Sequence, residues 1–519
     1  MDQKEVPIIV GVADVRNGSK KVDDAIEPIQ LMLQAIDLAI KDANTPSSHS
    51  SALRSSIDSI DVVSNWTWQY TDAPNLIVNR LGLVVKHASE SEQSGSQPAK
   101  LLDEAARRIS NRECRVALVT GGESLASYAA CAAANKIPPP NWTKPSKISD
   151  PISPKTALLP PGTSRIHGLG RPTQLYAMYE VALAAHRGQT IKESIEESAQ
   201  MYSQFAEIAE KNPYAWNYRQ PAKLAREIGN VTDKNRMICL PYPLLLNAFN
   251  TVNLAAACIL TSVGYAEELG IPKEKWIYMR GGAGTSDQEF LWERTNFASS
   301  VPVSLSLDAA LQVAELGPKD IDLVDIYSCF PVVPKLAALH LGYPLASRSK
   351  PLTLTGGMNS FGGAGNNYSM HAATEMVRQL RNGRGKNGLV LANGGHLTYE
   401  HVVILSVNPW SSGRKYPDQN PLPKLLVDNG PILEVVALGE AFIETYTVEF
   451  NRDGSPDQAF IIGRLGSSGR RFVANHGDAV TLNQLSNTSR LHVGRKGYVF
   501  PDNKSPERNR FSLEPVAQI

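Results

Sequence analysis

Hydrophobic and polar positions recur in the same order in two parts of the chain. Residues 60–66 and 324–330 both read aliphatic, Asp, two apolar or aromatic positions, Ser, any residue, aromatic. Short apolar runs of this kind are typical of buried strands. Because an internal repeat constrains an architecture more firmly than residue propensity does, the two copies provide the frame of the predicted fold.

Each copy is embedded in the same series of predicted elements. A Gly/Ser-rich turn is followed by a helical pattern and by an apolar strand that ends at a Gly-Gly pair, and an earlier strand and helix precede each copy. In the first half these parts are 94–96, 98–109 and 116–120, preceded by 8–12 and 28–42; in the second they are 362–365, 369–380 and 389–392, preceded by 276–279 and 307–316.

Each half therefore reads βαβαβ, which predicts a duplicated α/β fold. Strands that alternate with amphipathic helices indicate parallel sheets with helices on their faces. The alternative is a pair of unrelated α/β domains that only look alike.

Two other regions lie outside the repeat. Residues 125–240 are rich in Pro at first and then helical, which predicts an inserted loop domain. After residue 409 apolar and polar residues alternate between Gly-containing turns, which indicates a small antiparallel β domain, an open or closed barrel. We therefore predict an N-terminal half from 1–124 and 241–275, the insertion at 125–240, a C-terminal half at 276–410 and the added β domain at 421–519.

Length and charge exclude several classes of function. A chain of 519 residues suggests about three to four domains. Fifty-two basic against 51 acidic side chains give a formal charge of +1, so no global field attracts nucleic acid or a membrane surface. No stretch approaches the roughly 20 apolar residues of a membrane span. Without a secretory signal or a C-terminal Ser-Lys-Leu, we expect a cytoplasmic protein.

The cysteines indicate neither disulfides nor zinc. They are odd in number and have no CxxC spacing, which fits a reducing compartment. The five are Cys114, Cys131, Cys239, Cys258 and Cys329. On a strand, His396 and His401 would point to opposite faces, so they do not form a metal pair, and we expect no metal site.

The repeat resembles the thiolase superfamily over about residues 5–408, most closely the sterol-carrier-protein-2-type thiolases and the thiolase-like proteins. Residues 119–124 are similar to the family's Ala-Gly-Gly-x-Glu-Ser, 209–215 resemble its Asn-Pro-Tyr region, and 245–260 resemble the segment that usually holds Asp-Gly-Ala-Ala. The tail is similar to the added domain of thiolase-like proteins, such as acetyl-CoA acetyltransferase-like chains.

This resemblance implies a five-layer αβαβα thiolase fold with an OB-like C-terminal domain. It also implies a homodimer or homotetramer that takes a coenzyme A thioester as substrate and holds no permanently bound cofactor.

The catalytic loops depart from the family, and fold alone does not grant function. Thiolases place a nucleophilic Cys at the N-terminus of the first-half helix, where this chain has Gly95. The oxyanion-binding His of the second half matches Gly363, and the Cys of Cys-x-Gly matches Ala392. The fourth loop reads Tyr-Ser-Cys-Phe at 327–330, so Cys329 is the thiol that remains in place.

Cys329 is therefore the predicted proton-transfer residue, because the resembling Cys of the sterol-carrier type can take over that role. Tyr327 would assist it and His396 would act as general base. Packing as a small buried hydrophobe is the alternative for Cys329. Ser96 or Ser94 would replace the nucleophile, or would cap the helix instead.

The remaining candidates are predicted to contact the thioester. They are Ser94, Gly363, Asn366, Gly394 and Gly395. His371 faces either the active site or the sheet. The predicted function is an acyl-CoA acyltransferase of lipid or polyketide metabolism with non-standard catalytic residues. The alternative is an inactive thioester-binding protein or a scaffold that acts with a partner through its β tail.

Overall fold

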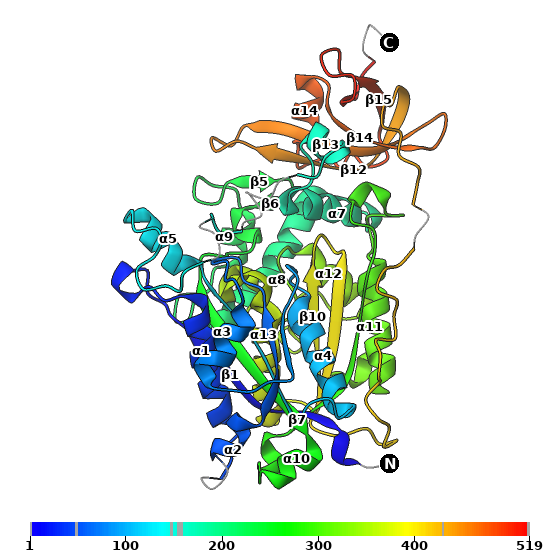
Figure 1. Ribbon diagram of the computed structural model, residues 1–519. Helices are drawn as coiled ribbons and strands as arrows, with labels where there is room; N and C mark the ends of the chain where they lie inside the picture. The colour runs from blue at the N-terminus through cyan, green and yellow to red at the C-terminus, as the bar shows by residue number, and fades with distance from the viewer. Residues whose placement is uncertain (1–2, 47–49, 146–148, 153–158, 428–429, 516–519) are drawn as a thin grey trace.

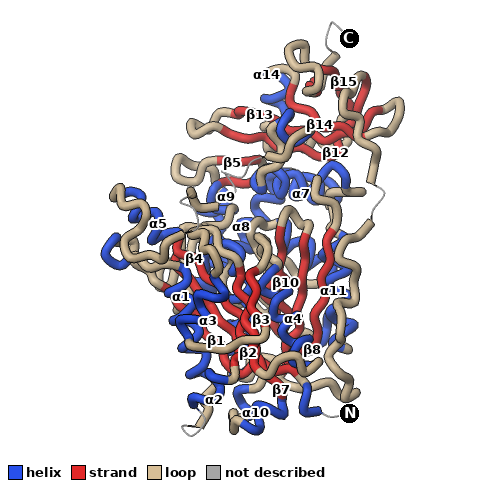
Figure 2. The backbone as a smooth tube through the Cα atoms, in the orientation of Figure 1, coloured by secondary structure: helices blue, strands red, loops and turns tan. Residues whose placement is uncertain are grey.

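We describe a computed structural model of the chain that covers residues 3–46, 50–145, 149–152, 159–427 and 430–515. Within these residues the strands form a nine-stranded sheet and a seven-stranded sheet. Figures 1 and 2 show the large sheet with its helices in one part of the molecule and the C-terminal strands at the other end, with helix α7 between them. No described helix has the length and apolar character needed to cross a membrane.

The N-terminal half supplies five strands of the large sheet. Its elements are β1 (Pro7–Arg16), α1 (Pro28–Asp42), α2 (Ser50–Ser55), β2 (Ile57–Val63), α3 (Ala73–Leu81), β3 (His87–Glu90), α4 (Gln97–Ser110) and β4 (Val116–Ser124), followed after the insertion by β7 (Asn253–Ser262) and α10 (Val263–Glu268).

The second half repeats this plan. Its elements are β8 (Ile277–Ser286), α11 (Val301–Ala314), β9 (Leu323–Ile326), α12 (Val332–Leu341), α13 (Tyr368–Arg381), β10 (Asn387–Gly394) and β11 (Tyr399–Ser406). The strand order is β3-β2-β4-β7-β1-β8-β11-β10-β9, so each half forms one side of the sheet. The halves join where β1 pairs with β8 at Ile9 and Ile277.

The helices complete five layers. Helix α1 covers β1, β4 and β7 on one outer side, and α11 covers β8 and β11 on the other. Helices α4 and α13 lie between the half-sheets and contact both, around a core that includes Leu102, Met376 and Val403. The apolar faces of the helices and sheets cover one another and so remove apolar surface from water. This burial is the main force that holds the layers together. The αβαβα architecture is thus confirmed.

The sheet is mixed, which corrects the expectation of parallel sheets. Strand β2 runs parallel to β3 and β4, and β9 runs parallel to β10. Strands β7 and β11, which the repeat pattern did not include, run antiparallel to their neighbours. Strand β7 is buried along nearly its whole length, so it has no polar alternation that would mark it as a strand.

The insertion consists of helices and a short hairpin. Its elements are α5 (Leu125–Ala133), α6 (Thr163–His167), α7 (Pro172–His186), α8 (Ile191–Lys211), α9 (Ala225–Gly229), β5 (Met237–Cys239) and β6 (Tyr242–Pro243). Helix α7 is buried on nearly every side, since it lies between the second half and the C-terminal strands. An all-round buried helix shows no amphipathic stripe.

The C-terminal domain is a closed barrel of five strands in the described residues. It consists of β12 (Gly439–Phe450), β13 (Pro456–Leu465), β14 (Arg471–His476), α14 (Ala479–Leu485), β15 (Lys496–Pro501) and β16 (Asn509–Ser512). Pairing of β12 with both β13 and β15 closes the ring, and β14 runs parallel to β16. Closure removes free strand edges. This agrees with the OB-like domain expected from the tail.

Candidate active site

Segments 94–96, 327–330 and 393–395 meet next to the N-terminus of α4. A Cβ atom built on Gly95 would lie 2.5 Å from the backbone oxygen of Asn393 and 2.5 Å from the hydroxyl of Tyr327. A Cβ built on Gly394 would overlap the hydroxyl of Ser94. Carboxyl ends of parallel strands share one edge of a sheet, so loops from distant parts of the sequence come together there.

Tyr327 fills the space beside Gly95, the residue that the family resemblance matches to the nucleophile of thiolases. Its side chain is buried, and its ring packs edge-on against Tyr368 with the centroids 5.6 Å apart. No side chain of normal size fits at residue 95 beside it. The glycine at that position is therefore a packing requirement of this chain.

Ser94 and Ser96 contact each other at this edge. Their hydroxyl oxygens are 2.8 Å apart, and the backbone N–H of Ser96 donates to the hydroxyl of Ser94 at 3.3 Å. Ser96 occupies the N-cap position of α4 but makes no side-chain capping bond, contrary to the capping role considered for it. The two hydroxyl groups thus bind each other within the loop and not the first turn of α4.

Cys329 points to the side of the sheet that faces α7. The side-chain N–H of Asn393 donates to the hydroxyl of Tyr176 at 2.8 Å and lies 3.7 Å from the sulfur of Cys329. The Tyr176 hydroxyl donates to the backbone oxygen of Gly395 at 3.0 Å, and its ring stacks on Phe330. The thiol is half-buried, and burial raises its pKa to about 12, so it is protonated near neutral pH.

Sequence reasoning did not find Asn393 and Tyr176. Asn393 is the middle residue of the altered Cys-x-Gly loop, a position that the family motif leaves open. Tyr176 comes from α7, and nothing in its neighbourhood in the sequence marks it as part of a site.

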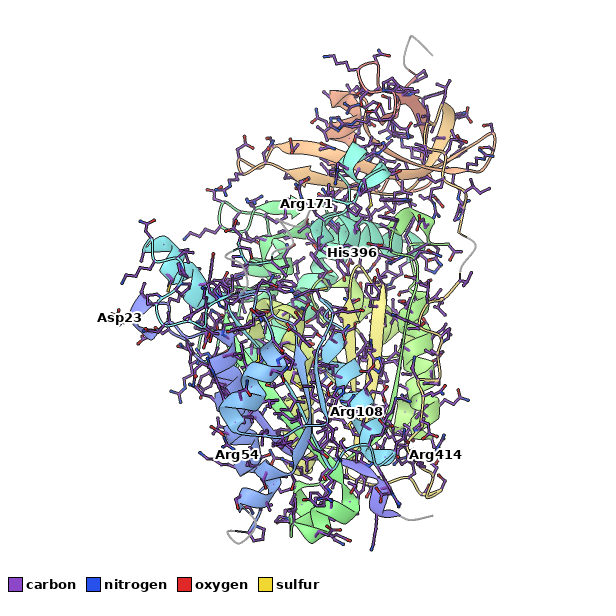
Figure 3. The ribbon with its side chains drawn as sticks, in the orientation of Figure 1. Asp23, Arg54, Arg108, Arg171, His396 and Arg414 are labelled. Carbon is purple, nitrogen blue, oxygen red and sulfur yellow. The ribbon has the colours of Figure 1, made fainter. Side chains whose placement is uncertain are left out.

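His396 has the properties of a weak base. Its ring is half-buried beside Tyr176, with the ring centroids 6.0 Å apart. Burial, with a smaller contribution from the charge of Arg294, lowers its pKa to about 3. Arg294 also donates to the backbone oxygen of His396 at 2.6 Å and to the Thr398 hydroxyl at 2.5 Å, which fixes this loop. Figure 3 places His396 near α7, far from the labelled Arg108 and Arg414.

Other parts of the protein bind or contact Asn366 and Gly363. The Asn366 side chain accepts from the indole of Trp66 at 3.1 Å and donates to the Gln93 amide oxygen at 2.6 Å. The N–H of Gly363 donates to the backbone oxygen of Phe249 at 2.7 Å, and a Cβ there would overlap Asn250. The polar atoms of Asn366 and the space beside Gly363 are thus taken up by other parts of the protein.

Glu123 is a buried acid next to this region. Its carboxylate accepts from the backbone N–H of Trp66 at 2.6 Å and from the backbone N–H and hydroxyl of Thr67 at 3.1 Å and 2.6 Å. Burial outweighs these bonds and raises its pKa to about 7. It also occupies the space above Gly365, so the loop before α13 packs directly on this carboxyl.

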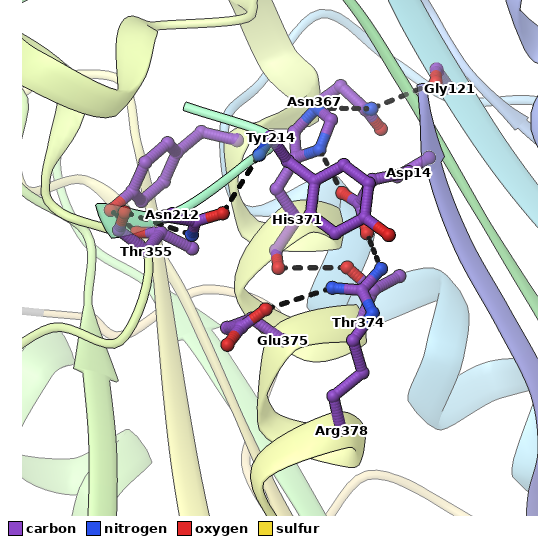
Figure 4. A network of polar contacts seen from close by, with 12 residues as sticks. Asp14, Gly121, Asn212, Tyr214, Thr355, Asn367, His371, Thr374, Glu375 and Arg378 are labelled. Atoms are coloured by element: carbon purple, nitrogen blue, oxygen red, sulfur yellow. Dashed lines mark hydrogen bonds and ion pairs between the residues drawn. The ribbon is translucent and has the colours of Figure 1, made fainter. Parts of the chain in front are cut away.

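His371 faces the sheet of the opposite half, which resolves the choice left open by the sequence. Its Nδ1 lies 2.5 Å from a carboxylate oxygen of Asp14, and Arg378 binds the other oxygen (Figure 4). The ring of Tyr214 covers the Arg378 guanidinium. Although burial raises the pKa of Asp14, the charges of Arg378 and His371 bring it below its usual value. The network links the two halves.

Comparisons with known proteins agree with the fold. The family model for the thiolase-like protein type 1 additional C-terminal domain matches residues 421–504, and the model for the thiolase C-terminal domain-like family matches residues 283–407. A sequence search of curated proteins finds no match.

Three solved structures illustrate the likeness. A monomeric SCP2-thiolase like protein type 1 from Mycobacterium smegmatis is 28% identical, with a TM-score of 0.79 over 98% of this chain and 100% of that chain. Acetyl-CoA acetyltransferase from Syntrophomonas wolfei is 16% identical, with a TM-score of 0.55 over 78% and 99%. Human mitochondrial 3-ketoacyl-CoA thiolase in complex with CoA is 16% identical, with a TM-score of 0.52 over 77% and 98%.

The fold and the comparisons together indicate the class. The two family models and the likeness to the Mycobacterium smegmatis structure support a thiolase-superfamily protein with an additional C-terminal domain.

Proposed function

We propose that this protein is an acyltransferase that acts on acyl-CoA or related thioesters with Cys329 as its proton-transfer residue. The observation that carries the proposal is the position of the Cys329 thiol where segments 94–96, 327–330 and 393–395 meet, 3.7 Å from the side-chain nitrogen of Asn393. The thiolase-like fold supports a thioester as the ligand, because the human relative with this fold binds CoA.

The transfer would proceed without a covalent acyl-enzyme at residue 95. Gly95 has no nucleophile, and Tyr327 fills the space beside it. In the proposed reaction the acceptor attacks the thioester carbon, the acyl–sulfur bond breaks, and the Cys329 S–H gives its proton to the departing CoA sulfur. The Cys329 thiolate then takes the proton that the acceptor loses, so atoms and charges balance. The raised pKa keeps the Cys329 thiol protonated before the reaction, and it makes the thiolate a strong base for the proton that the acceptor loses.

Turnover of a panel of acyl-CoA thioesters, followed as release of free CoA, tests the proposal. Cys329→Ala should lower the rate at least tenfold, roughly 1.4 kcal/mol of barrier. Cys131→Ala, which removes a buried thiol on α5, is the matched control and should leave the rate unchanged. Absence of CoA release from the wild-type protein with every thioester and acceptor would reject an acyltransferase.

A second candidate is a thioester-binding protein without catalysis. The packing of Tyr327 against Gly95 favours it, because the space of the usual nucleophile is closed. Such a protein binds acyl-CoA in calorimetry, and Cys329→Ala leaves its affinity unchanged. If a partner is required, deletion of residues 421–519 should abolish a complex that co-purifies with the full chain.

Assembly and location remain predictions. A homodimer or homotetramer in the cytoplasm is expected from the family resemblance, whereas the Mycobacterium smegmatis relative is described as monomeric. Sedimentation of the purified chain distinguishes these states.

A further inference from the structure

Glu400 is a buried acid for which the described residues provide no hydrogen-bond partner. It is the second residue of β11 and is 2% exposed. Both of its carboxyl oxygens are shielded from solvent, and neither has a hydrogen-bond partner in the part of the chain that the structure describes. A buried polar group left unpaired destabilises a fold, so such groups are rare and call for a functional explanation.

Asn393 has the same deficiency and is the cross-strand neighbour of Glu400. The two residues are directly paired between β10 and β11. Paired residues of antiparallel strands project from the same face of a sheet, with their Cβ atoms about 5 Å apart. The side-chain oxygen of Asn393 is buried and no described residue donates to it, while its N–H group lies 3.7 Å from the sulfur of Cys329.

The surroundings keep Glu400 uncharged. Burial is the largest cause of a pKa well above the usual value, the nearby Asp287 raises it further, and Arg294 offsets part of the increase. Arg294 is engaged elsewhere, with the backbone oxygen of Gln288 at 2.8 Å and with the oxygen of His396. A neutral carboxyl is a hydrogen-bond donor, which a carboxylate is not.

Glu400 also lies within electrostatic range of the candidate site. A negative charge on it would raise the pKa of Cys329 and of Tyr327, and also that of Tyr179 on α7. The titratable and charged groups that face it are therefore Asp287, Arg294, Tyr179, Tyr327 and Cys329. The side chains of Glu400 and Asn393, with their unpartnered oxygens, and the thiol of Cys329 thus lie on one side of the second half-sheet.

We propose that Glu400 is a substrate-binding acid that donates a hydrogen bond to the carbonyl oxygen of a thioester placed beside Cys329, with the Asn393 oxygen as the acceptor for a donor group of the same ligand. This rests on the proposed function, because it takes the thioester as the ligand. The donor would replace the oxyanion-binding His that is absent at Gly363, where the loop is occupied by Asn250. A neutral acid serves this purpose in an apolar site because it needs no counter-ion.

Infrared difference spectroscopy tests the protonation state without any substrate. The wild-type spectrum at neutral pH minus that of Glu400→Gln should contain the carbonyl band of a protonated carboxylic acid. Glu289→Gln, a change at an exposed glutamate on the loop after β8, should remove only a carboxylate band. A carboxylate band in the Glu400→Gln difference would overturn the proposal.

Binding of a non-hydrolysable acyl-CoA analogue, measured by calorimetry, tests the donor role. Glu400→Met removes the donor while preserving side-chain length, and it should weaken binding at least tenfold while raising the melting temperature. Glu400→Gln retains N–H groups and should weaken binding less. Wild-type affinity in Glu400→Met, or a lowered melting temperature with intact affinity, would show that Glu400 serves the fold only.

The two measurements separate this inference from the proposed function. If the wild-type protein binds the analogue but never releases CoA from any thioester, the acyltransferase is rejected while the Glu400 site stands. If the infrared band is absent while turnover is normal, the Glu400 site is rejected and the acyltransferase stands.

Discussion

The hydroxyl of Tyr327 lies where the side chain of residue 95 would begin, 2.5 Å from an ideal Cβ on Gly95. The backbone oxygen of Asn393 is equally close, and a backbone atom cannot swing away as a side chain can. The space beside residue 95 is therefore closed from two sides. Placing a Cys at this position would require changes in both neighbouring loops.

Gly95→Ala should destabilise the protein by about 1–3 kcal/mol, as overpacking of a filled site does. Denaturant unfolding followed by circular dichroism measures this. Gly317→Ala is the matched control, because a Cβ there meets its nearest atom, in Asp320, at an ordinary 3.6 Å. Equal stability of the two variants would contradict the closed site.

Cys329 should react slowly with iodoacetamide at neutral pH. A pKa raised from 9.0 to about 12 lowers the thiolate fraction by on the order of a thousandfold, and the thiolate is the reactive form. The rate should keep increasing with pH beyond 10. Mass spectrometry of the labelled peptides gives the rate, and Cys329→Ser serves as the control, since the other four cysteines are buried. Rapid labelling at pH 7 would show a more exposed thiol.

His371→Leu should lower the free energy of unfolding by about 3 kcal/mol. The change breaks a buried pair and leaves Asp14 with Arg378 alone. The comparison is His340→Leu, which removes a solvent-exposed pair with Asp308 at 2.7 Å and should change stability by less than about 1 kcal/mol. Chemical denaturation at pH 7 measures both variants. Similar losses in the two would mean that the buried pair contributes no more than the exposed one.

Glu123 should make stability decrease as pH rises from about 4.5 to about 7. Its folded-state pKa of about 7 lies above its usual value of 4.5, so in this window the folded state retains a proton that the unfolded state has released. The contribution is complete below pH 4.5 and is lost through pH 7. Unfolding free energies of the wild type minus those of Glu123→Gln should show this slope. Glu196→Gln, at an exposed residue, should show none.

Much of the scaffold could be predicted from the sequence, because its helices and turns have local signals. The helix expected at 28–42 has these bounds in the structure, and the one expected at 98–109 is α4 at Gln97–Ser110. Helix α1 repeats its apolar residues every three or four positions, and Pro28 begins it. Such patterns can be recognised in the sequence without knowledge of the tertiary fold.

The arrangement of the site could not be predicted in the same way. The sequence places Cys329 in the right loop, but the contact with Tyr176 depends on how α7 packs against the sheet. Glu400 has no local signal either, because an acid next to an exposed Tyr399 reads as an ordinary strand end. Its burial follows from long-range packing alone.

The pairing of the inserted hairpin with the C-terminal barrel has a consequence for how the chain is made. Cys239 of β5 pairs with Glu449 of β12, and the N–H of Leu240 donates to the oxygen of Val448 at 2.9 Å. About 210 residues separate the partners. At a synthesis rate of about 5–20 residues per second, the hairpin is synthesised roughly 10–40 s before its partner strand. Throughout that interval the nascent chain carries an open strand edge, which exposes it to mispairing and to chaperones.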